Sequence, residues 1–423
     1  MKAGDEEPIF ERCIRFAGNS EYARKLGYPG NPAMLQALGY YPYFVPLAET
    51  AGTEIVVDGR PRIMLGSNNY LGMTSHPGVV DAARRAIEQF GTGCTGSRLL
   101  NGTLEIHLEL EERLARFVGK EKAVAFSTGY QTNLGVVAAL LRKGDAVFAD
   151  KEVHASLIDG IHLARGSMGV KPRFFRHNDA EDLERLLAAC QRSKGKLVVV
   201  DGLYSMSGEV AAIPEIADVC RRHSARLLVD DAHALGVLGG GRGSCIQFDC
   251  LEEVDLITGT FSKSFASCGG FVAGPEEVIE WIRHMARPFL FSASLPPANV
   301  AVVLTVLSLL EESGEAVRKV NAIAGQMREA LACLGYEIRE SHGAIVPIVV
   351  GDELRAVQAW RRLMDLGVYT NAVVPPAVPP WFSGLRTSYM ATHTPDQLDR
   401  ALKVFADLHP WVEAARAAAG RGR

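Results

Sequence analysis

One lysine, Lys263, lies in a turn rich in small hydroxyl residues that spans residues 258–264. Residues 255–258 before it read as a short buried strand. A lysine held just past a core strand can be desolvated, so that its amine is neutral and nucleophilic at moderate pH. The hydroxyls of Thr260 and Ser262 could bind an anion beside it. These parts suit a Schiff-base lysine next to a phosphate, although a lysine among serines is more often an exposed loop residue.

Other polar side chains follow further apolar stretches, at residues 123–126, 145–149, 196–200 and 226–229. Continuous apolar strands that alternate with helices predict a parallel sheet covered on both faces. Ligands of such sheets bind beyond the carboxyl ends of the strands. The side chains at predicted ends of this kind are His154, Asp201, Ser205, Asp230, His233 and Lys263. Their convergence favours one common site.

Residues 127–133 (Ser-Thr-Gly-Tyr-Gln-Thr-Asn) link the first of these strands to a helix. A strand, a turn of small residues and a helix start can offer free amides and the positive end of a helix dipole to a phosphate. Capping of the helix by Ser127 or Thr128 is the ordinary alternative. We prefer the phosphate interpretation because the other strand ends carry matching chemistry.

Single residues of this set are weak evidence. A lone histidine such as His154 is usually structural or exposed, but at a strand end its ring could stack on a flat aromatic cofactor. Asn68 is one of two adjacent asparagines that suit a turn, and its amide could instead bind a substrate carboxylate. Arg386 could form a forked contact with a carboxylate or an ion pair between domains.

The composition is that of a globular protein. Of 423 residues, 48% are hydrophobic and 22% are charged, and the net charge of −4 gives no basic footprint for nucleic acid. The eight cysteines form no C-x-x-C pair, so reduced thiols are favoured over disulfides or a metal site. The polar, acidic start shows no secretory signal, and two long uncharged runs are too polar or too short to span a membrane. We therefore expect a cytoplasmic protein without a transmembrane segment or a bound metal.

The domain organisation is expected to have four parts. Residues 1–60 form an N-terminal arm of helical turns and a hairpin with its turn at Asp58-Gly59. Residues 61–297 form the large domain, and residues 298–410 form a smaller α+β domain. Residues 411–423 are an Ala/Arg-rich tail.

Six motifs together resemble the α-oxoamine synthase family of pyridoxal-phosphate enzymes, over roughly residues 45–408. They are residues 67–72 (Ser-Asn-Asn-Tyr-Leu-Gly), 127–133, 154–156 (His-Ala-Ser), 230–233 (Asp-Asp-Ala-His), 259–263 (Gly-Thr-Phe-Ser-Lys) and 385–386 (Leu-Arg). The resemblance implies the fold-type-I architecture of aspartate aminotransferase, with a mostly parallel large domain and a smaller α+β C-terminal domain. It also implies a homodimer with active sites at the subunit interface.

The resemblance assigns roles to residues. Lys263 forms the Schiff base with the cofactor, His154 stacks on its ring and Asp230 pairs with its ring nitrogen. The other residues that it places around the cofactor are Thr128, Gly129, Tyr130, Asp201, Ser205, His233, Thr260 and Ser262. Asn68 and Arg386 are implied as the substrate-carboxylate residues.

Two departures from the family pattern bear on this assignment. Asp201 stands where the family often has glutamate, so its contact is open. Residues 292–294 are implied to approach the phosphate from the other subunit, but Ala293 stands where some relatives carry a hydroxyl.

The activity implied is condensation of an amino acid with an acyl thioester, with loss of carbon dioxide. Residues 91–111, 287–297 and 385–394 are most similar to the bacterial members that join L-serine to a long-chain acyl-CoA, so serine is favoured. The donor could also be an acyl carrier protein thioester, and peripheral membrane contact is possible. Alternatives are a sister synthase such as 8-amino-7-oxononanoate synthase, one that uses glycine or alanine, or an aminotransferase of the same fold. A non-catalytic partner subunit is a further alternative, which Lys263 argues against.

Overall fold

The computed structural model describes residues 9–25, 30–50, 52–190 and 192–420, and the chain divides into two compact units. The larger unit contains residues 68–322 and 342–344. The smaller unit contains residues 1–67, 323–341 and 345–423, so the N-terminal segment clusters with the C-terminal part of the chain. These two compact units do not test the four-part division expected from the sequence, which stays a prediction.

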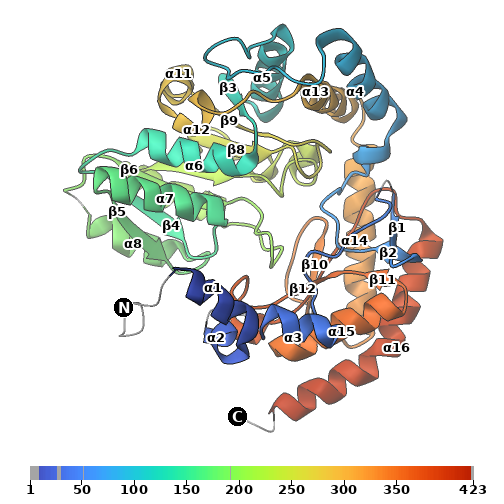
Figure 1. Cartoon of the computed structure of the whole chain (residues 1–423). Coiled ribbons are helices and arrows are strands. Elements are labelled where there is room, and N and C mark those ends of the chain that lie inside the picture. The colour runs from blue at the N-terminus through green and yellow to red at the C-terminus, as the bar shows by residue number, and fades with distance from the viewer. Residues whose placement is uncertain (1–8, 26–29, 51, 191, 421–423) are drawn as a thin grey trace. The chain divides into compact units, whose positions relative to one another are not determined.

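A seven-stranded sheet in the order β3-β9-β8-β7-β6-β4-β5 forms the centre of the larger unit (Figure 1). Its strands are β3 (Lys122–Phe126), β4 (Ala146–Asp150), β5 (Lys171–Phe175), β6 (Lys196–Asp201), β7 (Arg226–Asp230), β8 (Leu256–Thr260) and β9 (Gly270–Gly274). The strands from β8 to β5 pair in parallel, whereas β9 is antiparallel to both β8 and β3. The short link that carries Lys263 explains this reversal, because a parallel connection needs a crossover of a dozen or more residues.

Helices pack around this sheet and bury it. They are α4 (Pro77–Phe90), α5 (Glu105–Val118), α6 (Gly129–Leu140), α7 (Ala155–Met168), α8 (Ala180–Ala188), α9 (Ile213–Arg222), α10 (Ser244–Gln247), α11 (Glu276–Met285), α12 (Arg287–Leu290) and α13 (Pro297–Glu312). The helices α6 and α7 lie side by side (Figure 1), and their residues Val136 and Ile161 join Val199 and Leu228 of the strands in one fully buried cluster. The expected mostly parallel, covered sheet is therefore confirmed.

The two uncharged runs form buried elements. Residues 123–141 supply β3 and α6, and the second run ends in α13, which starts with Pro297 at its first turn and packs on α4 and α5. None of the helices within the described ranges is long and apolar enough to cross a membrane. The described cysteines are all free thiols, and four of them are buried.

The smaller unit holds two three-stranded sheets, β1-β2-β11 and β10-β13-β12. Its strands are β1 (Glu54–Val57), β2 (Arg60–Met64), β10 (Ile345–Val349), β11 (Val368–Tyr369), β12 (Asn371–Val373) and β13 (Gly384–Ser388). Its helices are α1 (Ile9–Gly18), α2 (Ser20–Lys25), α3 (Pro32–Ala37), α15 (Glu353–Asp365) and α16 (Pro395–Gly420), and α14 (Glu315–Cys333) begins in the larger unit. The β1–β2 hairpin turns at Asp58 and Gly59, whose φ angles of 49° and 70° suit a two-residue turn.

A buried histidine gives this smaller unit a pH-dependent stability. Nδ1 of His393 accepts the amide of Met390 at 2.9 Å, and Nε2 lies 3.1 Å from the carbonyl of Met64. Burial lowers the pKa of His393 to about 4 from an ordinary value of 6.5, so the unfolded chain takes up a proton first as the pH falls. The free energy of unfolding is therefore expected to drop by about 3 kcal/mol as the pH falls from 6.5 to 4.

Denaturant unfolding of the wild type and of His393→Gln at pH 7 and pH 4 measures this effect. The glutamine variant cannot take up the proton, so its loss of stability between the two pH values should be smaller by most of that amount. Equal losses in the two proteins would contradict the prediction.

Candidate active site

A cavity of about 260 Å³ lies beyond the carboxyl ends of the central strands of the larger unit. Ten of the residues predicted from sequence line it: Thr128, Gly129, Tyr130, His154, Asp201, Asp230, His233, Thr260, Ser262 and Lys263. They come from four strand ends and the start of α6. The convergence expected from the sequence is thus present in the fold.

Three predicted residues are placed differently. Ser205, half-buried in the loop after β6, and Asn68 are not among the described residues that line this cavity. Arg386 is buried in β13 of the smaller unit, opposite Pro347 and Asn371 in its sheet. The roles expected for these three residues stay predictions.

Asp230, the last residue of β7, is a buried carboxylate with a donor on each oxygen. The side-chain amide of Asn133 donates to one oxygen at 2.6 Å, and the backbone amide of Ala232 donates to the other at 3.0 Å. These contacts fix the carboxylate at the cavity wall. An anionic group held in this way can pair with a protonated ring nitrogen of a ligand.

The His154 ring is held as a neutral imidazole. Its Nδ1 accepts the backbone amide of Ser156 at 3.3 Å and lies 2.7 Å from the Ser156 hydroxyl, so Nε2 carries the proton. Burial lowers the pKa of His154; the Asp230 carboxylate opposes this shift and the Lys263 amine reinforces it. A neutral ring suits stacking on a flat heteroaromatic ligand.

Asp201 holds the backbone of His154 in place. It ends β6, directly beside Asp230 in the parallel register, and accepts the backbone amide of His154 at 3.2 Å. Burial and the neighbouring Asp230 charge raise the pKa of Asp201 well above its ordinary value, which favours the protonated form of Asp201. The contact left open by the sequence is therefore a backbone contact to His154.

The start of α6 lines one end of the cavity. Thr128 caps this helix, and its hydroxyl accepts the amide of Gln131 at 3.1 Å. A Cβ at Gly129 would approach the Thr260 hydroxyl to 2.7 Å, so only glycine lets the helix start lie this close to β8. The Thr260 and Ser262 hydroxyls lie 2.9 Å apart on the same wall. Amides and hydroxyls at a helix N-terminus suit a phosphate.

Residues 292–294 contact this end within the same chain. Gln131 donates to the Ser292 hydroxyl at 3.0 Å, and the Ser127 hydroxyl donates to the carbonyl of Ala293. The backbone of Ala293 thus takes part although its side chain has no hydroxyl. An approach of this segment from another subunit stays a prediction.

Three supporting residues were missed by the sequence analysis: Asn133, Ser156 and Tyr70. Asn133 and Ser156 line the cavity and are joined by a 2.9 Å hydrogen bond. Tyr70 is fully buried, and its hydroxyl lies 2.7 Å from Nδ1 of His233 and 3.1 Å from the side-chain oxygen of Asn68. All three belong to recognised motifs, and that position was the only signal that could have pointed to them.

Asn133→Ala tests this support. The variant removes the 2.6 Å donor from the Asp230 carboxylate, and a hydrogen bond to a charged group contributes about 1.5–3 kcal/mol. We expect kcat/KM to fall by about tenfold to a hundredfold while the thermal unfolding temperature changes little. Gln131→Ala, two residues earlier in α6 and bonded to Ser292, is the matched control. An equal loss in both variants would point to a general disturbance of α6.

Comparisons with known proteins show the family to which the chain belongs. Residues 60–405 match the aminotransferase class I and II family. A serine palmitoyltransferase of Bacteriovorax stolpii is 42% identical over 87% of this chain and 87% of its own. A putative 8-amino-7-oxononanoate synthase 2 of Mycobacterium tuberculosis is 45% identical over 88% of this chain, but only 47% of that protein is covered.

Solved structures show the same fold. A serine palmitoyltransferase of S. paucimobilis with bound PLP and myriocin has a TM-score of 0.87 and 37% identity, and the match covers 90% of this chain and 96% of that one. The serine palmitoyltransferase of Sphingomonas wittichii matches with a TM-score of 0.86, 37% identity and the same coverage. By sequence and by fold, therefore, the chain belongs to the aminotransferase class I and II family.

Proposed function

We propose that this chain is a pyridoxal-phosphate acyltransferase that condenses L-serine with a long-chain acyl-CoA and releases carbon dioxide, the reaction of a serine palmitoyltransferase. Its product would be a 3-oxo amine such as 3-ketosphinganine. The observation that carries the proposal is the meeting of Lys263, Asp230 and His154 at one cavity with the α6 N-terminus. Relatives named serine palmitoyltransferase, 41–42% identical over most of the chain, support the choice of substrates.

Pyridoxal phosphate fits the residues that line the cavity. Lys263 supplies an amine for its aldehyde, and Asp230 supplies a carboxylate for its ring nitrogen. The neutral His154 ring suits its face, and the capped start of α6 with Thr260 suits its phosphate. When bound, this cofactor supplies an electron sink for a carbanion at the amino acid Cα.

Several residues of the chain have separate roles in the proposed reaction. Lys263, which lines the cavity, would act as the general base that accepts the Cα proton of the amino acid. Asp230 would hold the proton on the ring nitrogen, and Asn133 fixes that carboxylate. His154, held through its backbone by Asp201, covers the ring and excludes water from one side. Tyr70 orients His233 through the contact at Nδ1.

Substrate binding and assembly are further parts of the proposal. Arg386 and Asn68 would hold the amino acid carboxylate, and Arg386 is a buried guanidinium that can make forked contacts. A homodimer with shared active sites would complete the cavity, with residues 292–294 of one subunit near the phosphate of the other. Replacement of Arg386 or Asn68 by alanine should weaken amino acid binding more than acyl-thioester binding.

The test is kcat/KM for acyl-CoAs of graded length, with serine, glycine and alanine as amines. We expect serine to be preferred and the rate constant to rise with chain length, by about fourfold per methylene at about 0.8 kcal/mol each, until the acyl groove ends. A preference for a short dicarboxylic acyl group, or for glycine over serine, would overturn the substrate assignment and leave the condensation chemistry intact.

A second candidate is 8-amino-7-oxononanoate synthase activity. It is favoured by the 45% identity to the Mycobacterium tuberculosis relative and by a 40% identical synthase of Thermoanaerobacter pseudethanolicus. Alanine with a dicarboxylic acyl thioester is the substrate pair that would reveal it in the same assay. Half-reaction turnover with a keto acid would instead indicate an aminotransferase.

A further inference from the structure

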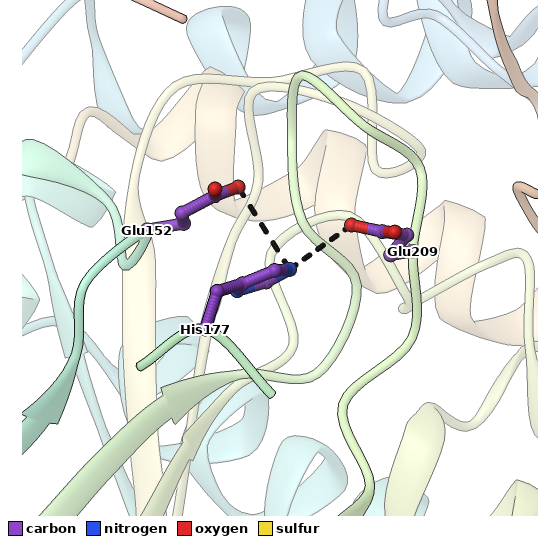
Figure 2. A group of neighbouring side chains, drawn as sticks. All are labelled: Glu152, His177 and Glu209. Carbon is purple, nitrogen blue, oxygen red and sulfur yellow. Dashed lines mark hydrogen bonds and ion pairs between the residues drawn. The ribbon is translucent and has the colours of Figure 1, made fainter. Parts of the chain in front are cut away.

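A cluster of one imidazole and two carboxylates lies outside the cofactor cavity of the larger unit. Glu152 follows β4, His177 follows β5, and Glu209 lies in the loop between β6 and α9. Figure 2 shows both carboxylates turned toward the same ring nitrogen. Nε2 of His177 lies 3.0 Å from Oε2 of Glu209 and 3.8 Å from Oε2 of Glu152, and the three potential ligand atoms lie within 4.8 Å of one another.

The other ring nitrogen is fixed by a deeper carboxylate. Nδ1 of His177 lies 2.9 Å from Oδ1 of Asp150, which is fully buried and also accepts the amides of Glu152 and Asn178 at 2.8 and 2.7 Å. Because Asp150 accepts here, Nδ1 carries the proton. This leaves Nε2 facing the two glutamates. A histidine whose second nitrogen donates to a carboxylate is the usual arrangement around a protein-bound metal ion.

A proton on Nε2 serves only one of the two glutamates. One N–H can point to Glu209 at 3.0 Å, but the same proton does not reach Glu152 at 3.8 Å. A cation placed among the three atoms would contact all of them. The side chain of Glu152 is 39% exposed, so an ion has a path from solvent and room for water ligands.

A buried hydroxyl beside the cluster gives independent support. Tyr204 is 2% exposed, its ring meets the His177 ring edge-on at 4.4 Å, and its hydroxyl makes no hydrogen bond of normal geometry to the described residues. Burial, followed by the carboxylates of Asp150 and Asp201, raises the pKa of Tyr204 well above its ordinary value. A water molecule bound to a cation in the cluster would supply the partner that this hydroxyl lacks.

We propose that Glu152, His177 and Glu209 bind a divalent transition-metal ion of the Mn²⁺ to Zn²⁺ series, with water completing its coordination. One imidazole and two carboxylates suit these ions, whereas Mg²⁺ prefers oxygen ligands alone. The ion would tie together the loops that follow β4, β5 and β6. This site does not depend on the proposed catalytic function, because none of its three ligands lines the cofactor cavity.

The test is titration of the intact, cofactor-loaded protein with Zn²⁺ in competition with a chelating dye, and with Mg²⁺ in parallel. We expect one Zn²⁺ per chain and no competition by Mg²⁺. Glu152→Gln/Glu209→Gln should weaken Zn²⁺ binding by at least about tenfold, because it removes two anionic ligands and keeps the histidine. The matched control is Glu184→Gln/His223→Asn, which removes a separate Glu–His pair at 3.5 Å and should leave the affinity unchanged.

Acidic groups surround His177 and affect its pKa. Burial works against a charged His177, but its hydrogen bonds to Asp150 and Glu209 raise its pKa to about 10. The groups that face it are Asp150, Glu152, Glu209 and Tyr204.

Two outcomes would overturn the proposal. Equal Zn²⁺ affinity in the wild type and in Glu152→Gln/Glu209→Gln, with both proteins folded by thermal unfolding, would show adventitious binding elsewhere. Absence of binding at millimolar Zn²⁺ would show that His177 serves only as an imidazolium between Asp150 and Glu209.

Discussion

Replacing Lys263 by alanine is expected to lower turnover by at least about a thousandfold and to remove the Schiff-base absorbance of the cofactor. Lys263 lines the cavity on the link between β8 and β9, with the Thr260 and Ser262 hydroxyls on the same wall. Both its proposed roles, as the amine that holds the cofactor aldehyde and as the base that takes the Cα proton, depend on the same nitrogen. Alanine keeps the backbone and removes both roles at once.

Lys171→Ala is the matched control. Lys171 begins β5, at the amino end of an edge strand and thus away from the carboxyl ends that form the cavity. Absorbance spectra and steady-state rates of the two variants at equal protein concentration give the comparison. Full activity in Lys263→Ala would remove the basis of the whole catalytic interpretation, whatever the substrates are.

The surroundings of Lys263 illustrate what the sequence can predict. Apolar runs of four or five residues predicted β3, β4, β6, β7 and β8, because such runs between helices suit strands buried on both faces. The carboxyl ends of parallel strands share one edge, so His154, Asp201, Asp230 and Lys263 had to approach one another. This argument needs only the order of elements along the chain.

The supporting contacts needed the structure itself. Asn133 meets Asp230 only because α6 has a particular rotation over the sheet, and Ser156 meets His154 because of the start of α7. A periodic pattern shows which helix face is apolar but does not fix which polar residue points at a given strand end. The raised pKa of Asp201 likewise follows from the β6–β7 register, which puts it beside Asp230.

The sequence analysis did not predict β5, and the position of this strand at the edge of the sheet explains why. β5 (Lys171–Phe175) is an edge strand whose residues are mostly half-buried or exposed, so its sequence lacks the continuous apolar run of the inner strands. The direction of β9, antiparallel to β8, follows from the short link between the two strands. The direction of a strand depends on the segment that connects it to the strand before it. The composition of the strand itself says little about that segment.

Asp230→Asn is expected to retain cofactor binding and to slow exchange of the substrate Cα proton by about tenfold to a hundredfold. The substitution keeps the shape of the side chain, but a neutral amide cannot hold a proton on the ring nitrogen as a carboxylate does. It also places an amide NH₂ against one of the two donors, Asn133 and Ala232, that now approach the carboxylate oxygens. The cofactor ring would then be a weaker electron acceptor at an almost unchanged position.

Asp231→Asn provides the isosteric control for this result. Asp231 is the next residue and is fully buried, but its oxygens are bonded to Ser244 and it does not line the cavity. Exchange of the Cα proton of L-serine in deuterated water, followed by proton NMR, compares the two variants without any acyl donor. A wild-type rate in Asp230→Asn would show that Asp230 only ends a strand. A loss confined to Asp230→Asn, with unchanged serine binding, would place its effect in the deprotonation step, because neither carboxylate size nor burial distinguishes the two aspartates.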